Sequence, residues 1–246
     1  MARPIYLLFG VVAYLIFFVT FLYLIAFVGN LPWVPVTVDG GGPDASLGVA
    51  IGIDLALIAL FGLQHSVMAR QGFKAAWTRM VPAPIERSTF VLFASGALIL
   101  LFLLWRPIPE PVWTVGNGTA ATILWVLFAI GWLVVLLSTF LISHFELFGV
   151  KQVWDNLRSA TIAAPVFRQP FFYRFIRHPL YAGFFIAFWA TPAMTQGHLL
   201  FAVAMSLYML IAIRFEERDL VRMFGTQYVE YRVRVGMLTP RLRRTN

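Results

Sequence analysis

The chain has 246 residues, of which 60% are apolar and only 12% are charged, and its mean hydropathy is +0.80. Soluble domains contain roughly 45–50% apolar and about 25% charged residues, so this composition excludes an ordinary soluble domain and indicates an integral membrane protein. The absence of cysteine excludes disulfides, thiolate metal sites and a cysteine nucleophile.

Four apolar segments have about the 20 residues that a helix needs to cross the hydrocarbon core of a bilayer. In chain order they are 5–28, 47–68, 88–104 and 122–143. Two shorter apolar runs follow, 180–195 and 199–213, and we expect a hairpin joined by Gln196, Gly197 and His198. Its short limbs leave open whether it crosses fully. Because a lipid-exposed backbone must satisfy its own hydrogen bonds, the expected fold is an all-α, polytopic membrane bundle of about five to six transmembrane helices.

The basic residues indicate the orientation of these helices. Arg106 lies between the third and fourth spans, whereas the other Lys and Arg residues fall at the N-terminus, between spans two and three, between spans four and five, or after Ile213. Those regions share one side of the membrane if the chain crosses an even number of times, and the positive-inside rule makes that side cytoplasmic. Both termini are therefore predicted to be cytoplasmic. The net charge of +8 then reflects topology and contact with anionic lipids, and no nucleic-acid binding is expected.

Ionisable groups beside the spans converge on the predicted cytoplasmic boundary. Such groups are costly in a membrane and indicate functional sites by default. The groups at this depth are Gln64-His65, Glu86-Arg87, the stretch Ser143–Glu146, Arg177-His178 and Glu216-Glu217. Structural interpretations stay open for His144, which would complement a helix C-terminus, and for Glu86, which would favour a first helical turn.

The C-terminal region carries a composite motif. Its parts are Arg177-His178-Pro179-x-Tyr181-x-Gly183, then Glu216-Glu217-x-x-Leu220, then Phe224-Gly225-x-x-Tyr228-x-x-Tyr231. The composite resembles the signature of the integral-membrane methyltransferases, which include the isoprenylcysteine carboxyl methyltransferases and the phospholipid methyltransferases. This resemblance implies that the motif binds S-adenosylmethionine on the cytoplasmic side, while the methyl acceptor arrives from the membrane.

A narrower resemblance covers most of the chain, from about Phe61 to Val235. The stretches "LFGLQHSVMAR", "VPAPIERSTFVLFAS", "LLFLLWRPIP" and "ISHFELFGVKQVW" are together similar to bacterial methanethiol S-methyltransferases, and the N-terminal half is also similar to NnrU-type membrane proteins. The resemblance implies a small volatile thiol as substrate, membrane lipids as surroundings and the bacterial inner membrane as location. It leaves the oligomeric state open.

We accordingly expect one membrane-embedded methyltransferase domain over residues 1–246. Its parts are a four-helix membrane part (1–143), a cytoplasmic connection (144–179), a helix hairpin (180–213) and a cytoplasmic cofactor-binding tail (214–246).

The charged residues of the motif suit the charged parts of the cofactor. The Arg177 fork suits a carboxylate through paired, charge-assisted hydrogen bonds. Adjacent glutamates suit the ammonium group and the ribose hydroxyls. Glu216 and Glu217 point about 100° apart on a helix, so one is expected to face the cofactor and the other to pair with Arg214 or Arg218.

The remaining motif residues are expected to shape the site. Pro179 opens a helix at its first turn, which leaves the backbone groups of His178 free for the cofactor. Gly183 makes room for the cofactor or for a facing helix. The face formed by Leu220, Phe224, Tyr228 and Tyr231 is expected to be a lid over the adenine, part of an amphipathic helix on the membrane surface, or both. The predicted cofactor-binding residues are Arg177, His178, Pro179, Tyr181, Gly183, Glu216, Glu217, Leu220 and Tyr228.

Methyl transfer to a thiol needs alignment of the two sulfurs with the methyl carbon, and a base. A free thiol is mostly protonated at pH 7, since even cysteine has a pKa of about 8.5, so a histidine base fits. The candidates are His65 and His144, with Glu146 as an orienting partner and Arg87 stabilising the thiolate. No metal site is predicted. Large side chains are expected to plug the lipid-facing route that a prenyl acceptor would use.

Three other functions share parts of this pattern. A methyltransferase of a larger acceptor, such as an isoprenylcysteine carboxylate, another thiol or a lipid, would use the same hairpin. A membrane cytochrome would hold a haem between His65 and His144. A non-enzymatic NnrU-like role would leave the C-terminal motif unexplained.

Overall fold

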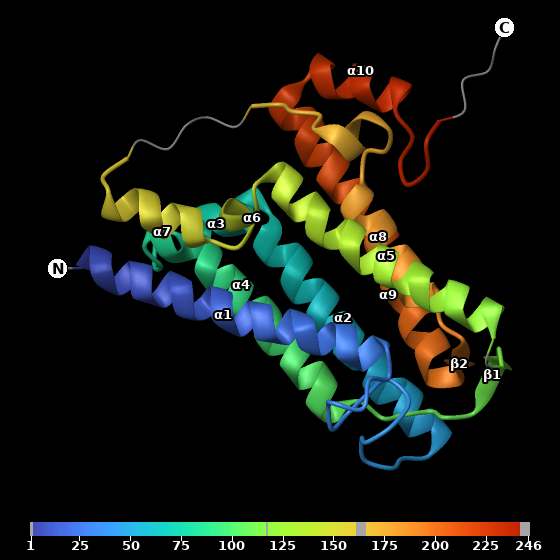
Figure 1. Ribbon diagram of the computed structural model, residues 1–246. Coiled ribbons are helices and arrows are strands. Elements are labelled where there is room, and N and C mark those ends of the chain that lie inside the picture. The colour runs from blue at the N-terminus through green and yellow to red at the C-terminus, as the bar shows by residue number, and fades with distance from the viewer. Residues whose placement is uncertain (1, 117, 161–165, 242–246) are drawn as a thin grey trace, which may run out of the picture. The chain divides into compact units, whose positions relative to one another are not determined.

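The computed structural model describes residues 2–116, 118–160 and 166–241, and helices dominate it (Figure 1). Its long apolar helices each exceed the roughly 20 residues that a membrane crossing requires. They are α1 (Ala2–Val28), α2 (Leu47–Ala69), α4 (Ala83–Leu104), α5 (Thr119–Ile142) and α9 (Gln196–Phe224). The predicted all-α, polytopic membrane fold is confirmed.

Shorter elements connect and follow these helices. They are α3 (Gln71–Trp77), β1 (Pro111–Thr114), α6 (His144–Leu147), α7 (Val150–Leu157), a 3-10 turn η1 (Phe171–Arg174), α8 (Pro179–Trp189), β2 (Ala193–Thr195) and α10 (Thr226–Arg234). The strands β1 and β2 pair in a two-stranded sheet.

The C-terminal hairpin differs from its prediction. Gln196, Gly197 and His198 are the first turn of α9 and not the connecting turn, which instead occupies residues 190–195. Thr195 explains the shift, because its hydroxyl accepts the N–H of His198 at 3.1 Å, as an N-cap residue does. His198 is fully buried and lies within α9, not in the predicted connecting turn. The limbs are also unequal, since α8 has 11 residues and α9 has 29.

The chain forms two compact units from interleaved segments. The first contains the described residues of Met1–Trp113, His144–Ala163 and Met194–Ala204. The second contains the described residues of Thr114–Ser143, Ala164–Ala193 and Met205–Asn246. The fourth long helix, α5, thus belongs with α8 in the second unit.

In the first unit, α1 lies beside α4 and α7 (Figure 1). The contact requires a glycine in α1, because a Cβ atom on Gly10 would lie 2.6 Å from Val153 and 3.2 Å from the hydroxyl of Ser88. Gly149 has a φ of +87° and starts α7 directly against the backbone of Ser88. These close approaches hold α6 and α7 against the N-terminal ends of α1 and α4.

In the second unit, α5 and α8 run side by side (Figure 1). Their backbones touch at two glycines: a Cβ on Gly131 would lie 2.8 Å from the carbonyl oxygen of Gly183, and one on Gly183 would lie 2.7 Å from that of Gly131. Small residues permit this approach between membrane helices, where dispersion replaces the hydrophobic effect as the driving force. The contact fixes α8 and therefore the residues that precede it.

Candidate functional site

Arg177 and His178 stand directly before α8, which begins at Pro179 as predicted. Proline suits this position because its missing N–H would have no partner within the helix. The N–H groups of Arg177 and His178 donate to the carbonyls of Gly236 and Met237 at 2.8 and 3.1 Å, and the His178 carbonyl accepts the first hydrogen bond of α8. The expectation that His178 offers free backbone groups to a cofactor is therefore wrong.

Glu217 joins the basic residues of the motif. Its Oε1 accepts from Arg177 Nε at 2.7 Å and lies 3.2 Å from His178 Nε2, while its Oε2 is 3.7 Å from Arg232 Nε. Arg177 also donates through Nη1 to the carbonyls of Arg232 and Val235. The start of α8, the end of α9 and the segment after α10 are thus tied together at one carboxylate.

This arrangement corrects the predicted ion pairs. One of Glu216 and Glu217 was expected to face the cofactor, which stays a prediction, and the other to pair with Arg214 or Arg218; Glu217 instead pairs with Arg177. The reason is that α9 continues well past Ile213 and turns Glu217 towards the start of α8, whereas Arg214 and Arg218 are exposed. Figure 1 shows α9 as one unbroken helix in this region.

The aromatic residues that follow form a small core, not one helical face. Gly225, with a φ of +56°, separates α9 from α10, so Leu220 and Phe224 lie on one helix while Tyr228 and Tyr231 lie on the next. Residues of the two helices nevertheless pack in one hydrophobic cluster. Its buried members are Tyr228, Tyr231 and Val235, and the residues packed against them are Phe167, Leu220, Val221 and Phe224. The inner face of α10 is accordingly covered by the chain itself.

The two tyrosines of this core differ in their hydroxyl groups. Tyr231 Oη donates to the carbonyl of Tyr173 at 2.6 Å. Tyr228 Oη is buried and has no hydrogen-bond partner among the described residues. Burial raises the pKa of Tyr231 to about 12, and burial together with the carboxylates of Glu217 and Glu216 raises the pKa of Tyr228. Both phenols therefore stay protonated at neutral pH, and Tyr228 keeps a donor for a further partner.

Tyr181 and Gly183 lie one turn into α8. The Tyr181 ring is 5.7 Å from that of His178, edge to face. Gly183 faces Gly131 of α5, so of the two reasons considered for this glycine the structure shows the facing helix. The cofactor-binding roles of the motif residues stay predictions.

In the first unit, His65 and Arg87 pack on the same aromatic ring. The His65 ring lies 4.9 Å from Phe90 and 5.4 Å from Phe61, and the guanidinium of Arg87 lies 4.7 Å above Phe90. His65 Nδ1 is buried and has no hydrogen-bond partner within the described ranges. Arg87 Nε donates to the carbonyl of Leu147 at 2.7 Å, which ties α4 to α6.

His144 lies at the start of α6, in a pocket of aromatic rings. Its Nε2 is 2.9 Å from the hydroxyl of Tyr14, and Phe145 and Phe148 contact its ring at 5.3 and 4.9 Å. Burial lowers the pKa of His144, which keeps the ring neutral at pH 7. Glu146 is exposed, and the contact at His144 Nε2 comes from Tyr14 on α1. The orienting role of Glu146 stays a prediction.

No protein-family model and no solved structure matches the chain. Methanethiol S-methyltransferase 1 of Bradyrhizobium diazoefficiens is 53% identical over 234 residues, which are 95% of this chain and 81% of the relative. The methanethiol S-methyltransferase of Mycobacterium tuberculosis is 50% identical over 240 residues, 98% of each chain. This chain belongs to the methanethiol S-methyltransferase family. Nurim of Homo sapiens is more distant, 30% identical over 222 residues and 82% of each chain. The resemblance inferred from the sequence motifs is confirmed.

Sequence reasoning missed several residues that shape the sites of this family member. Tyr14 binds a candidate base, Phe90 carries both His65 and Arg87, and Arg232 completes the cluster at Glu217. Tyr14 and Phe90 sit inside apolar runs where nothing distinguishes them from lipid-facing aromatics. The sequence could have indicated Arg232, because this residue directly follows the motif residue Tyr231.

Proposed function

We propose that this protein transfers a methyl group from S-adenosylmethionine to the sulfur of methanethiol, giving dimethyl sulfide and S-adenosylhomocysteine. The observation that carries the proposal is the 53% and 50% identity, over nearly the whole chain, to relatives named methanethiol S-methyltransferase. In this reaction the acceptor sulfur gains the S–CH₃ bond, the sulfonium S–CH₃ bond breaks, and the thiol proton leaves.

The residues around Glu217 are proposed to hold the methyl donor, which supplies an electrophilic methyl group on a sulfonium. The polar groups on hand fit such a ligand. Tyr228 Oη is a buried donor without a partner among the described residues, and Glu217 Oε2 has a long contact with Arg232 at 3.7 Å. Arg177 uses its Nε and Nη1 within the protein, which leaves Nη2 for a ligand carboxylate.

On the acceptor side, a neutral histidine is proposed to take the thiol proton. His65 Nδ1 lies buried with no partner in the described parts of the chain, and burial keeps His144 neutral. Arg87, held on Phe90 and by the Leu147 carbonyl, provides a fixed positive charge beside His65 that favours a thiolate. The protein positions these groups through aromatic packing.

The proposal puts the donor-binding residues on the cytoplasmic face of the bacterial inner membrane, and the distribution of basic residues supports this. Lys and Arg residues cluster in the connections that hold α3, α7 and the residues after α9. S-adenosylmethionine, which is charged, would then bind from the cytoplasm, while methanethiol, which is apolar, would also arrive through the bilayer.

The test is a direct assay of the product. Purified protein in detergent is incubated with S-adenosylmethionine and methanethiol, and dimethyl sulfide is measured by headspace gas chromatography. Product that depends on both substrates supports the proposal. If calorimetry shows cofactor binding but no product forms, the acceptor is a larger thiol, a prenylcysteine or a lipid. If the protein shows no cofactor binding and no product, the methyltransferase function is refuted for this chain.

A further inference from the structure

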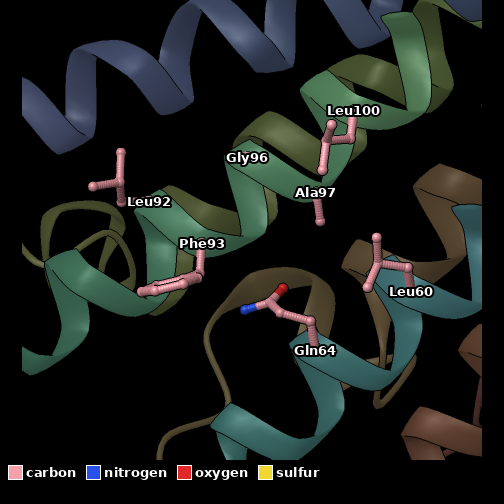
Figure 2. A pocket seen from close by; sticks show the side chains of 7 residues that line it. All are labelled: Leu60, Gln64, Leu92, Phe93, Gly96, Ala97 and Leu100. Atoms are coloured by element: carbon pink, nitrogen blue, oxygen red, sulfur yellow. The ribbon is translucent and has the colours of Figure 1, made fainter. Parts of the chain in front are cut away.

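A groove runs between α2 and α4 in the first unit, with a volume of about 540 Å³ (Figure 2). We call it the α2–α4 groove. It is lined by Leu60, Gln64, Leu92, Phe93, Gly96, Ala97 and Leu100. Gln64 is the one polar side chain in this lining, and Figure 2 shows it reaching from α2 towards Phe93 and Ala97 of α4.

The groove opens to the outer surface of the two helices. The side chains along its edges are about half exposed: Leu60 by 47%, Phe93 by 50% and Leu100 by 44%. Since α2 and α4 are both long and apolar enough to span a membrane, we expect this surface to face lipid hydrocarbon. Any ligand of the groove therefore reaches it from the membrane.

Glycine keeps the groove open. A Cβ atom on Gly96 would have nothing within 4 Å, so the missing side chain leaves free space. The next residue, Ala97, is also small. A larger residue at Gly96 would occupy this space without displacing the helices.

Gln64 gives the groove a specific chemistry. Its Nε2 donates to the sulfur of Met68 at 3.1 Å, while its Oε1 is buried without a hydrogen-bond partner in the described part of the chain. A buried acceptor of this kind is costly unless a ligand donates to it. An acyl chain has no donor, whereas a thiol combines a small apolar body with a weak S–H donor.

We propose that the α2–α4 groove admits the methyl acceptor, a small neutral thiol, from the bilayer, and that Gln64 Oε1 accepts the hydrogen bond from its S–H group. The inference rests on the proposed function and adds the acceptor's binding site. Gln64 directly precedes His65, the proposed base, on α2, so the groove lies next to that base along the helix, although His65 itself is not part of the lining. Gly96 sets the size of thiol that fits.

Two substitutions separate the hydrogen bond from the space. Gln64→Leu replaces the amide with a shorter apolar side chain and so removes the acceptor oxygen together with the Nε2 contact to Met68. We expect KM for methanethiol to rise roughly two- to ten-fold with little change in kcat. Gly96→Leu fills the groove and should raise KM further. Gly52→Leu is the matched control, since Gly52 is also a helical glycine with nothing within 4 Å of its Cβ position, and it lies outside the groove. It should keep the wild-type KM.

The absence of cysteine allows a test on a single folded sample. Gly96→Cys is assayed before and after reaction with N-benzylmaleimide and removal of excess reagent, with Gly52→Cys and the cysteine-free wild type as controls. Loss of turnover confined to labelled Gly96→Cys supports the groove. Wild-type KM in both Gln64→Leu and Gly96→Leu, or full activity after labelling, overturns the inference.

A binding measurement distinguishes this inference from the proposed function. Ethanethiol binding is followed by saturation-transfer difference NMR, which needs no turnover. A signal in wild type that is lost in Gly96→Leu supports a thiol groove even if no dimethyl sulfide forms. A signal that persists unchanged in Gly96→Leu, or no signal in wild type, overturns the inference that the groove binds a thiol, even if the enzyme is active. The groove would then be occupied by lipid chains.

Discussion

The Arg177–Glu217 ion pair offers the sharpest test of the cluster before α8. Their 2.7 Å contact is largely buried, with 11% and 12% of the two side chains exposed. Arg177→Met leaves Glu217 with its longer contacts to His178 and Arg232, and Glu217→Gln leaves Arg177 without its carboxylate. Breaking a buried pair by removing one partner costs about 3–5 kcal/mol. At about 2–4 °C per kcal/mol for a chain of this size, each single variant should lower Tm by roughly 6–20 °C.

The double variant should lose less than the sum of the two singles, because neither charge is then left alone. We expect a coupling energy of about 1.5–3 kcal/mol, the range for a hydrogen bond to a charged group. Unfolding in detergent is followed by tryptophan fluorescence, since the chain has 8 Trp residues and no cysteine for thiol-reactive dyes. Calorimetry with S-adenosylhomocysteine on the same samples reports the effect on donor binding.

A matched surface pair provides the control. Lys151 and Asp155 also lie 2.6 Å apart, but 46% of the Lys151 side chain is exposed, so removing Lys151 should cost less than about 1 kcal/mol. If the losses in the free energy of unfolding from the Arg177 and Glu217 single variants add within about 0.5 kcal/mol in the double variant, the two residues are not coupled. The proposed stabilising ion pair is then refuted.

Three further predictions address hydroxyls, helix contact and pH. Tyr231→Phe should destabilise the protein by about 0.5–1.5 kcal/mol, as measured by thermal melting. Tyr228→Phe should leave Tm unchanged and should weaken S-adenosylhomocysteine binding roughly two- to ten-fold, as measured by calorimetry. Gly183→Ala should cost about 1–3 kcal/mol by forcing α5 and α8 apart. Burial lowers the pKa of His144, so the folded chain binds fewer protons than the unfolded chain near pH 6. Stability should therefore fall as pH drops through about 6.5, and less so in His144→Gln.

Each of these has a result that contradicts it. Equal loss of stability in both tyrosine variants would mean that the Tyr228 hydroxyl has a structural partner. Gly52→Ala serves as the control for Gly183→Ala, because its Cβ position is open, and equal effects would remove the helix-contact argument. For His144, identical slopes of Tm between pH 7.5 and 5.5 in wild type and variant would show that this ring does not titrate as its burial requires.

The sequence by itself determined the class of fold and the motif. Long apolar runs without charges can only be membrane helices, and α1, α2, α4 and α5 lie where these runs predict them. Pro179 fixed the start of α8, because proline's missing N–H has a place only in a first turn. The spacing of the charged and aromatic motif residues indicated the family, since that spacing depends on local chain order.

Only the tertiary structure decided the partners. The hydropathy of residues 196–198 indicates a turn, but the hydroxyl of Thr195 caps a helix there. Glu217 pairs with Arg177, 40 residues away in the chain, because α9 extends beyond its apolar part. The groove at Gln64 is likewise invisible in the sequence, where it is one amide in an apolar run. Periodicity reports which residues one helix places on a face, whereas contacts between helices depend on glycine approaches and caps that involve residues distant in the chain.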